Sequence, residues 1–438
     1  DNVMTFSPVS HHQDGALYID PQALANALPH FEYIDGTLHF DGINTHTLKE
    51  IYGTPLYAYS QRTLLENYQS YTDAFDAIDH QICYAVKANS NLAILKTLAK
   101  AGAGFDIVSK GELARVLQVA DAKKVVYSGV GKTADDIEYA LKADIHCFNV
   151  ESLSELDTIN EVAGRQNQIA RISLRINPDV DAKTHPYIST GMKDNKFGIS
   201  HEQAVAAYVY AHHLPNLKIV GIDCHIGSQL LDTDGFSDAL DKLIELIDTL
   251  TDKGIKLQHI DLGGGLGVRY IDENPVSIDQ VATVLLPRLK QLGLKLYLEP
   301  GRSLVANAGV LLTTVDVLKP TEFKNFAIVD ASMSELIRPA LYESQMAIIP
   351  AKLSRDTAKT WDVVGTVCES SDFLGKDRIL SLQVGDTLAV TGAGAYGFSM
   401  ACNYNTRPRP CEVMVNHGTH RLIRKREALD DLWKDELI

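Results

Sequence analysis

The stretch ICYAVKANSNLAILKTLAKAGAGFDIVSKGEL, residues 82–113, contains the pattern that decides the fold. Two short apolar runs, 82–86 and 104–108, are separated by an amphipathic segment. Short apolar runs bounded by turn residues are typical of buried strands, and helical periodicity between them predicts a crossover helix. The stretch therefore predicts a strand–helix–strand unit of a parallel sheet.

The same alternation continues on the C-terminal side to about residue 305. The strand candidates are 82–86, 104–108, 125–128, 146–150, 172–176, 219–225, 259–262 and 294–298. Most are followed by a helix signal, for example the apolar face formed by Phe236, Leu240, Leu243, Ile247 and Leu250. Eight strand–helix units predict a (β/α)8 TIM-type barrel.

Two of the expected helices have recognisable starts. Thr133 with Asp136, and Ser152 with Glu155, have the spacing of capping boxes. These pairs predict helices directly after the third and fourth strands.

The pattern changes near residue 305, after which strand-like runs follow one another with turns between them. Such a succession favours a separate β domain, a β-sandwich or β-barrel. Residues 1–54 do not join the earlier alternation, and they contain the strand-like run Thr37-Leu38-His39-Phe40. We expect a barrel over 55–308 and a β domain built from 1–54 and 309–438.

Composition narrows the class of protein. The chain has 438 residues, 45% of them hydrophobic, and a net charge of -15, which argues against a nucleic-acid partner because such proteins cluster Lys and Arg. The six cysteines are scattered without a CxxC pair, so we expect neither a metal site nor a disulfide framework. No signal peptide or membrane-length apolar run is visible. A cytoplasmic small-molecule enzyme is therefore expected, with no membrane association.

Polar and glycine residues gather where the expected strands end. In chain order they are Lys87, Asp106, Ser109, Glu151, Arg175, Asn177, His225, Gly227, Ser228, Gly263 to Gly265, Glu299 and Arg302. Barrel enzymes carry their chemistry at the C-terminal ends of the strands, where the loops converge. The distribution predicts an active site at that mouth.

Several runs together resemble the diaminopimelate decarboxylase family, which belongs to the alanine-racemase-like group of pyridoxal-phosphate enzymes. They are YAVKAN (84–89), GAGFDIVSKGEL (102–113), FNVESLSEL (148–156), HIGSQ (225–229), LGGGLG (262–267), EPGR (299–302), LIRPALY (336–342), CES (368–370) and GAGAYG (392–397). The resemblance extends from about residue 55 to the end. It implies a homodimer with shared active sites that converts meso-2,6-diaminopimelate to L-lysine and CO2 in lysine biosynthesis, with pyridoxal 5'-phosphate as cofactor. Thr366, Ser371 and Ser332 depart from the family pattern, at positions without a chemical role.

The resemblance assigns the central cofactor contacts. Lys87 matches the lysine that holds pyridoxal phosphate as an imine, although an isolated lysine at a strand end is ordinarily just solvated. Glu299 matches the carboxylate that keeps the pyridine nitrogen protonated, and its alternative is an ion pair with Arg302. His225 matches the histidine that stacks on the cofactor ring, and its alternative is a structural histidine.

Glycine residues are expected around the cofactor phosphate, because backbone N–H groups can approach an anion closely where no Cβ intervenes. A bare triple glycine is more often only a turn. The resemblance assigns these further residues to the cofactor: Ser228, Gly264, Gly265, Gly301, Arg302 and Tyr396.

The resemblance also implies how the substrate is held. Arg302, Arg338 and Tyr342 match residues that bind a substrate carboxylate, which suits the planar fork of a guanidinium. Glu369 matches the group that binds the distal amino group, and Cys368 matches the proposed proton donor to Cα, contributed by the neighbouring subunit. Tyr396 is also placed at the substrate. The alternatives are a surface arginine at 338 and a buried, inert cysteine at 368.

Three other functions remain open. A related decarboxylase of ornithine, arginine or a carboxylated polyamine is disfavoured by Arg338 and Glu369. An amino-acid racemase is disfavoured by Glu299, because racemases of this group place an arginine against the ring nitrogen. A non-enzymatic homologue would be expected to have lost the lysine or the cysteine.

Overall fold

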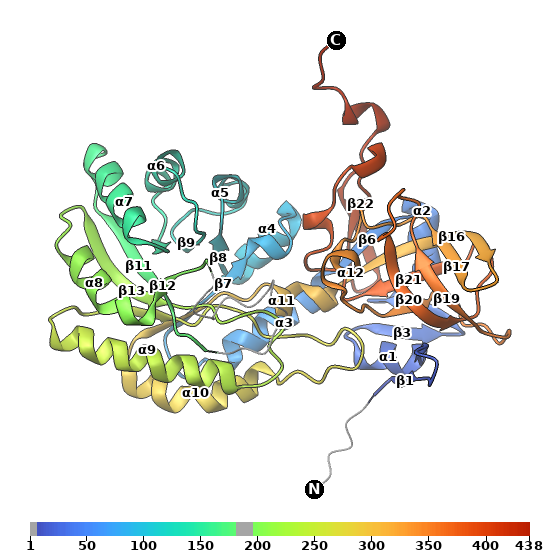
Figure 1. Ribbon diagram of the computed structural model, residues 1–438, viewed down its shortest axis with the longest axis horizontal. Helices are drawn as coiled ribbons and strands as arrows, with labels where there is room; N and C mark the ends of the chain where they lie inside the picture. Colours follow the sequence, from blue (N-terminus) through green and yellow to red (C-terminus); the bar gives the residue numbers. More distant parts are fainter. Residues whose placement is uncertain (1–6, 181–195) are drawn as a thin grey trace, which may run out of the picture. The chain divides into compact units, whose positions relative to one another are not determined.

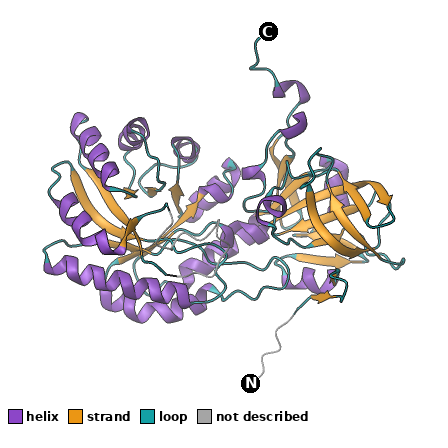
Figure 2. Ribbon diagram, viewed as in Figure 1, coloured by secondary structure: helices purple, strands orange, loops and turns teal. Residues whose placement is uncertain are grey.

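The computed structural model describes residues 7–180 and 196–438. The chain divides into two compact units (Figures 1 and 2). A barrel unit comprises residues 67–267 and 275–303, and a β unit comprises 1–66, 268–274 and 304–438.

The barrel unit contains a closed ring of parallel strands. In chain order these are β7 (His80–Ala85), β8 (Gly104–Ile107), β9 (Val125–Tyr127), β10 (Cys147–Val150), β11 (Ala170–Asn177), β13 (Leu217–Asp223), β14 (His259–Asp261) and β15 (Lys295–Leu298). Neighbours in sequence pair with one another, and the pairing of β15 with β7 closes the ring. A short strand, β12 (Ile199–Ser200), pairs in parallel with the C-terminal end of β11. The predicted (β/α)8 barrel is confirmed, with all eight predicted strands.

Helices surround this ring (Figure 2). They are α4 (Leu92–Ala101), α5 (Lys110–Leu117), α6 (Ala134–Ala143), α7 (Leu153–Arg165), α8 (Ala204–His212), α9 (Asp234–Asp252) and α10 (Ile278–Leu292). The apolar face predicted for 236–250 lies on α9, and all five of its residues are buried. Inside the ring, Cys83, Val126, Cys147, Val220 and Tyr297 form a packed layer, so the barrel is filled rather than hollow.

One of the two predicted capping boxes forms completely. At the start of α6, Thr133 and Asp136 cap each other's backbone N–H groups. At the start of α7, Ser152 accepts from the N–H of Glu155, but the Glu155 carboxylate turns to the buried ammonium of Lys132 at 3.0 Å instead of returning to Ser152. A buried lysine is costly unless it is paired, which accounts for the different partner.

The β unit is built on an 11-stranded sheet. Its main path runs β1 (Val9–His11), β2 (Leu17–Ile19), β20 (Phe373–Leu380), β19 (Lys359–Val364), β17 (Asn325–Val329), β16 (Gly309–Pro320), β6 (Leu56–Ser60), β22 (Cys411–Asn416) and β23 (Thr419–Arg424). Off this path, β21 (Thr387–Thr391) pairs with β16, and β18 (Ile348–Pro350) pairs with β21. A second sheet joins β3 (Phe31–Ile34), β4 (Thr37–Phe40) and β5 (Ile43–Asn44). The predicted second β domain is confirmed as a fold class.

The unit boundaries differ from the expected barrel span of 55–308. Strand β6 (Leu56–Ser60) lies in the β unit, antiparallel to β16 and parallel to β22. All five of its residues are buried, because it is a central strand covered on both faces. Residues 268–274 and 304–308 also belong to the β unit. These segments belong to the β unit because of contacts with residues distant in sequence, which no local sequence pattern indicates.

The helices of the β unit are short: α1 (Pro21–Ala27), α2 (Thr45–Tyr52) and α12 (Arg338–Tyr342). Two further helices, α3 (Gln61–Ala74) and α11 (Arg302–Val305), straddle a unit boundary. Across the described ranges, no helix has both the length and the apolar character needed to cross a bilayer.

Candidate active site

Lys87 lies directly after β7, in a short 3-10 turn (Val86–Ala88). Val86 and Ala88 are buried, whereas the Lys87 side chain is exposed. Burial raises the pKa of Asp106 and lowers that of His225, and the charge of Lys87 acts to lower both, so all three groups share one end of the barrel. No hydrogen bond or ion pair joins Lys87 to any described residue. Its amine is therefore free at the mouth.

Glu299 follows β15 and is buried. Its carboxylate accepts a hydrogen bond of 3.2 Å from Nδ2 of Asn149. The guanidinium of Arg302 donates instead to Oγ of Ser228 at 2.8 Å. The alternative ion pair between Glu299 and Arg302 is therefore not formed.

Three further carboxyl groups surround Glu299 inside the barrel: Asp106, Asp223 and Asp261. Burial, and after it the charges of these neighbours, raise the pKa of Glu299 well above its usual value. Burial likewise raises the pKa of Asp223 to about 7, although Ser173 donates to it at 2.5 Å. A cation that lies against a buried carboxyl group favours its charged form, and the protonated nitrogen of a pyridine ring is such a cation.

The loop Gly263-Gly264-Gly265 follows β14 in very close contact with its neighbours. A Cβ on Gly264 would lie 2.3 Å from the carbonyl oxygen of Glu299, and one on Gly265 would lie 2.5 Å from that of Gly227. The backbone N–H groups of Gly264, Gly265 and Gly301 have no acceptor among the described residues. Free N–H groups on loops without Cβ atoms suit a phosphate. The barrel mouth thus has the features that pyridoxal phosphate needs.

His225 follows β13 at the same end. Burial, with the charges of Lys87 and Arg175, lowers the pKa of its imidazole well below 6.5. The ring is therefore neutral near pH 7, and a neutral ring can stack on an aromatic cofactor without a charge penalty. Arg175 is itself paired with Glu151 at 2.9 Å.

In the β unit, the guanidinium of Arg338 is surrounded by aromatic rings. It lies 5.5 Å from the ring centre of Tyr270, 5.2 Å from that of Tyr342 and 5.9 Å from that of Tyr396. Arg338 is only 4% exposed, so the alternative of a surface arginine is wrong. Cation–π contacts with these three rings hold the arginine in place.

Cys368 and Glu369 occupy another loop of the β unit, after β19. Cys368 is exposed, so the alternative of a buried, inert cysteine is wrong. Its backbone N–H donates to Oδ1 of Asn405 at 2.9 Å. The carboxylate of Asp372 accepts from the N–H groups of Val367 at 2.9 Å and Met333 at 2.8 Å. Hydrogen bonds therefore fix the backbone of the clamped loop, the loop that carries the Cys368 thiol, on both sides of this residue.

The predicted site residues form two sets. One lies in the barrel unit: Lys87, His225, Ser228, Gly264, Gly265, Glu299, Gly301 and Arg302. The other lies in the β unit: Arg338, Tyr342, Cys368, Glu369 and Tyr396. Within the second set, Arg338, Tyr342 and Tyr396 are in contact, and Cys368 and Glu369 belong to the clamped loop.

Sequence reasoning missed four residues of these clusters. Asp223 and Asp261 end β13 and β14, and an acidic residue ending an otherwise apolar strand was the signal available. Asn149, which donates to Glu299, lies inside a buried strand. Tyr270 had no local signal, because it reaches Arg338 only through the tertiary fold.

Comparison with known proteins agrees with this geometry. Residues 61–306 match the family model described as pyridoxal-dependent decarboxylase, pyridoxal binding domain. The chain is 56% identical over 406 residues to the diaminopimelate decarboxylase of Vibrio cholerae, covering 92% of this chain and 97% of that protein. The chain belongs to the diaminopimelate decarboxylase family. It is therefore related over 92% of its length to a pyridoxal-dependent carboxy-lyase family, as the sequence runs predicted.

Solved structures of the family have the same fold. The diaminopimelate decarboxylase of Helicobacter pylori complexed with L-lysine superposes with a TM-score of 0.87 at 44% identity, covering 90% of this chain and 99% of that one. The enzyme from M. jannaschii superposes with a TM-score of 0.90 at 40% identity, covering 95% and 99%. The prediction of a diaminopimelate-decarboxylase-type fold is confirmed over both units.

Proposed function

We propose that this chain removes CO2 from meso-2,6-diaminopimelate to give L-lysine, with pyridoxal 5'-phosphate as cofactor. The observation that carries the proposal is the barrel mouth, where the free amine of Lys87, the buried carboxyl of Glu299 and the unpaired glycine N–H groups meet. Membership of the diaminopimelate decarboxylase family supports the choice of substrate.

Each barrel residue has a defined task in this proposal. The cofactor, when bound, supplies a conjugated electron sink for the electrons released as the carboxylate leaves. Lys87 is its attachment point, and Glu299 holds a proton on the ring nitrogen. Neutral His225 stacks on the ring. Ser228, Gly264, Gly265 and Gly301 hold the phosphate together with Tyr396 of the β unit, and Arg302 is a further cofactor contact.

Substrate selection is assigned to the β unit. Arg338 and Tyr342, with Arg302, bind the carboxylate of the distal centre, and Glu369 binds its amino group. Tyr396 completes this pocket. Substrates ending in an amine would call for an acidic group in place of Arg338, so the proposal disfavours ornithine and arginine. Cys368 supplies the proton that replaces CO2 at Cα.

The decisive assay measures CO2 release and product identity. We expect release from meso-diaminopimelate and none from L-lysine, L-ornithine or L-arginine. If diaminopimelate is not decarboxylated and a diamine precursor is, the protein is instead a related decarboxylase. A product that keeps its carboxylate but has lost its single configuration at Cα would establish a racemase. No turnover at full cofactor occupancy would point to a non-enzymatic homologue.

We further propose a homodimer in which Cys368 and Glu369 of one chain act at the barrel mouth of its partner. Exposure of Cys368 on a clamped loop supports this. Mixed dimers of Lys87→Ala and Cys368→Ala chains should recover part of the activity, because one of the two mouths then contains both groups. Complete inactivity of verified mixed dimers would argue against shared sites.

The proposed compartment is the cytoplasm. All six cysteines are free thiols, and this agrees with a reducing environment.

A further inference from the structure

Strand β20 contains a bulge that redirects one arginine. Arg378 lies opposite Trp361 of β19 and Gly375 lies opposite Val363, so three steps along β20 match two steps along β19. Asp377 takes up the extra residue with a φ of 52°, and its N–H donates to Oδ1 of Asp362 at 2.9 Å. Bulges re-aim side chains, and here Arg378 is turned to the same face as Gly375.

Arg378 is buried without a counter-charge. The side chain is 4% exposed, and a Cβ on Gly375 would lie 3.0 Å from its Cζ, so only glycine leaves room for the guanidinium. Its Nη1 is buried and has no hydrogen-bond acceptor, and no ion pair joins Arg378 to the described part of the chain. Burial lowers the pKa of Arg378 to about 10, which leaves the group charged near pH 7.

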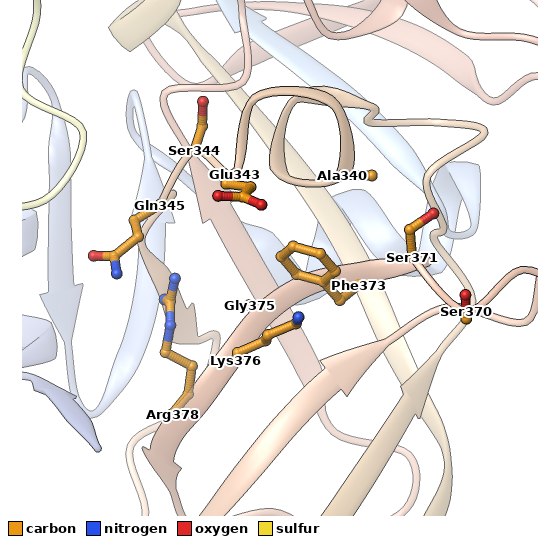
Figure 3. Close-up of a pocket in the computed structure, with 10 residues that line it drawn as sticks. All are labelled: Ala340, Glu343, Ser344, Gln345, Ser370, Ser371, Phe373, Gly375, Lys376 and Arg378. Carbon is orange, nitrogen blue, oxygen red and sulfur yellow. The ribbon is translucent and has the colours of Figure 1, made fainter. Parts of the chain in front are cut away.

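A cavity of about 560 Å³ adjoins this guanidinium, and Figure 3 shows its lining. Lys376 lies on the same strand, with its ammonium 4.3 Å from the ring centre of Phe373. Neutral donors come from Ser344, Gln345, Ser370 and Ser371. Glu343 also lines the cavity, but no ion pair joins it to Arg378 or Lys376. No residue assigned above to cofactor or substrate lines this space.

We propose that this cavity binds a small free anion whose carboxylate or phosphate oxygens pair with Arg378 and Lys376. A buried guanidinium is strongly disfavoured unless it is paired, and the planar fork of arginine matches such oxygens in a bidentate manner. The hydroxyl and amide groups provide further donors. The volume lies in the range of small-molecule pockets, roughly 300–1,000 Å³.

The cavity also touches the loop of the proposed proton donor. Ser370 and Ser371 follow Cys368 and Glu369 directly in the chain. An anion held by Arg378 would therefore contact that loop at Ser370, whose hydroxyl donates to Oε1 of Glu369 at 3.3 Å. The binding itself does not depend on the proposed reaction.

The test uses the cofactor-loaded protein and inorganic phosphate as the probe, titrated at constant ionic strength against sodium chloride. We expect a saturable rise in the unfolding temperature of the unmodified protein. Arg378→Met should abolish the rise, and Lys376→Gln should weaken phosphate binding roughly tenfold. Arg355→Gln removes the same charge from an exposed position of the same unit and should leave the response unchanged.

The unfolding temperature without phosphate tests whether Arg378 is an unpaired buried charge. Arg378→Met should then unfold at or above the temperature of the unmodified protein, because it removes an unpaired buried charge. If Arg378→Met does not fold, the phosphate titration of Lys376→Gln is the test, because Lys376 is exposed. A phosphate response that both variants retain, the absence of any saturable response, or an Arg378-dependent change only in oligomeric state would overturn the proposal.

Discussion

Glu299 shares the barrel interior with Asp106, Asp223 and Asp261, and burial raises the pKa of each of these carboxyl groups. Burial favours the neutral form of such a group, and a cation that lies against it favours the charged form. A ring nitrogen that carries a proton would favour the ionised form of Glu299. The carboxyl and the cofactor therefore stabilise one another's charge.

Glu299→Gln retains the shape of this side chain and removes its charge. We expect kcat for diaminopimelate to fall roughly 10²–10³-fold, the usual effect of removing one preorganised electrostatic contact. Cofactor occupancy, measured from the absorbance of the bound chromophore, should change much less. A variant with nearly normal kcat would contradict the role assigned to Glu299.

Gly264→Ala tests the phosphate loop. The new Cβ would meet the carbonyl oxygen of Glu299 at 2.3 Å, so the backbone must shift and its N–H groups must move with it. We expect the dissociation constant of pyridoxal phosphate to rise at least about tenfold, the effect of losing one charge-assisted contact, as measured by fluorescence titration. Gly131→Ala is the matched control, because nothing lies within 4 Å of its added Cβ. Equal affinities in the two variants would show that the loop does not bind the phosphate.

At the scale of elements, the loop after β19 depends on groups outside itself. Asn405 accepts from the N–H of Cys368 while its own backbone adopts a φ of 60°, and Asp372 ties the loop to Met333. These bonds fix the backbone on either side of the thiol. Asn405 is therefore a positioning residue for Cys368 within the proposed function.

Asn405→Ala should lower kcat roughly tenfold with a smaller change in KM, because the hydrogen bond holds the thiol in place and does not touch the substrate. Asn405→Asp keeps the acceptor oxygen and should restore most of the activity. The alkylation rate of Cys368, measured in a Cys402→Ser background because Cys402 is also exposed, should change in Asn405→Ala and recover in Asn405→Asp. An unchanged alkylation rate would rule out positioning through this bond.

At the scale of the whole molecule, buried histidines make stability depend on pH. Burial lowers the pKa of His146 to about 4 and that of His259 to about 3, and both rings pack against Tyr297 within the barrel. Below pH 6.5 the unfolded chain binds protons that the folded chain does not. The contribution of these two histidines to the free energy of unfolding therefore falls as the pH drops from about 7 toward 4. Asp223, with its pKa raised to about 7, acts in the opposite direction.

His259→Gln isolates one of these contributions. Each histidine should lower the free energy of unfolding by about 2 kcal/mol when the pH falls from 7 to 5. Urea unfolding at the two pH values should show a smaller loss for the variant by about that amount, whatever its stability at pH 7. The carboxylates are present in both proteins, so their contribution cancels in the comparison. An identical loss in both proteins would mean that His259 titrates normally.

The sequence by itself determined the barrel, because each of its eight strands has a local signal in an apolar run and most are followed by a helical face such as that of α9. It also placed Lys87 and Glu299 at strand ends. Only the tertiary structure decided that β6 joins the β unit, that Tyr270 packs on Arg338, and that Asp223 and Asp261 surround Glu299. The reason is physical: periodicity reports which face of an element is buried, whereas pairing between strands and the pKa of a buried group depend on neighbours distant in sequence.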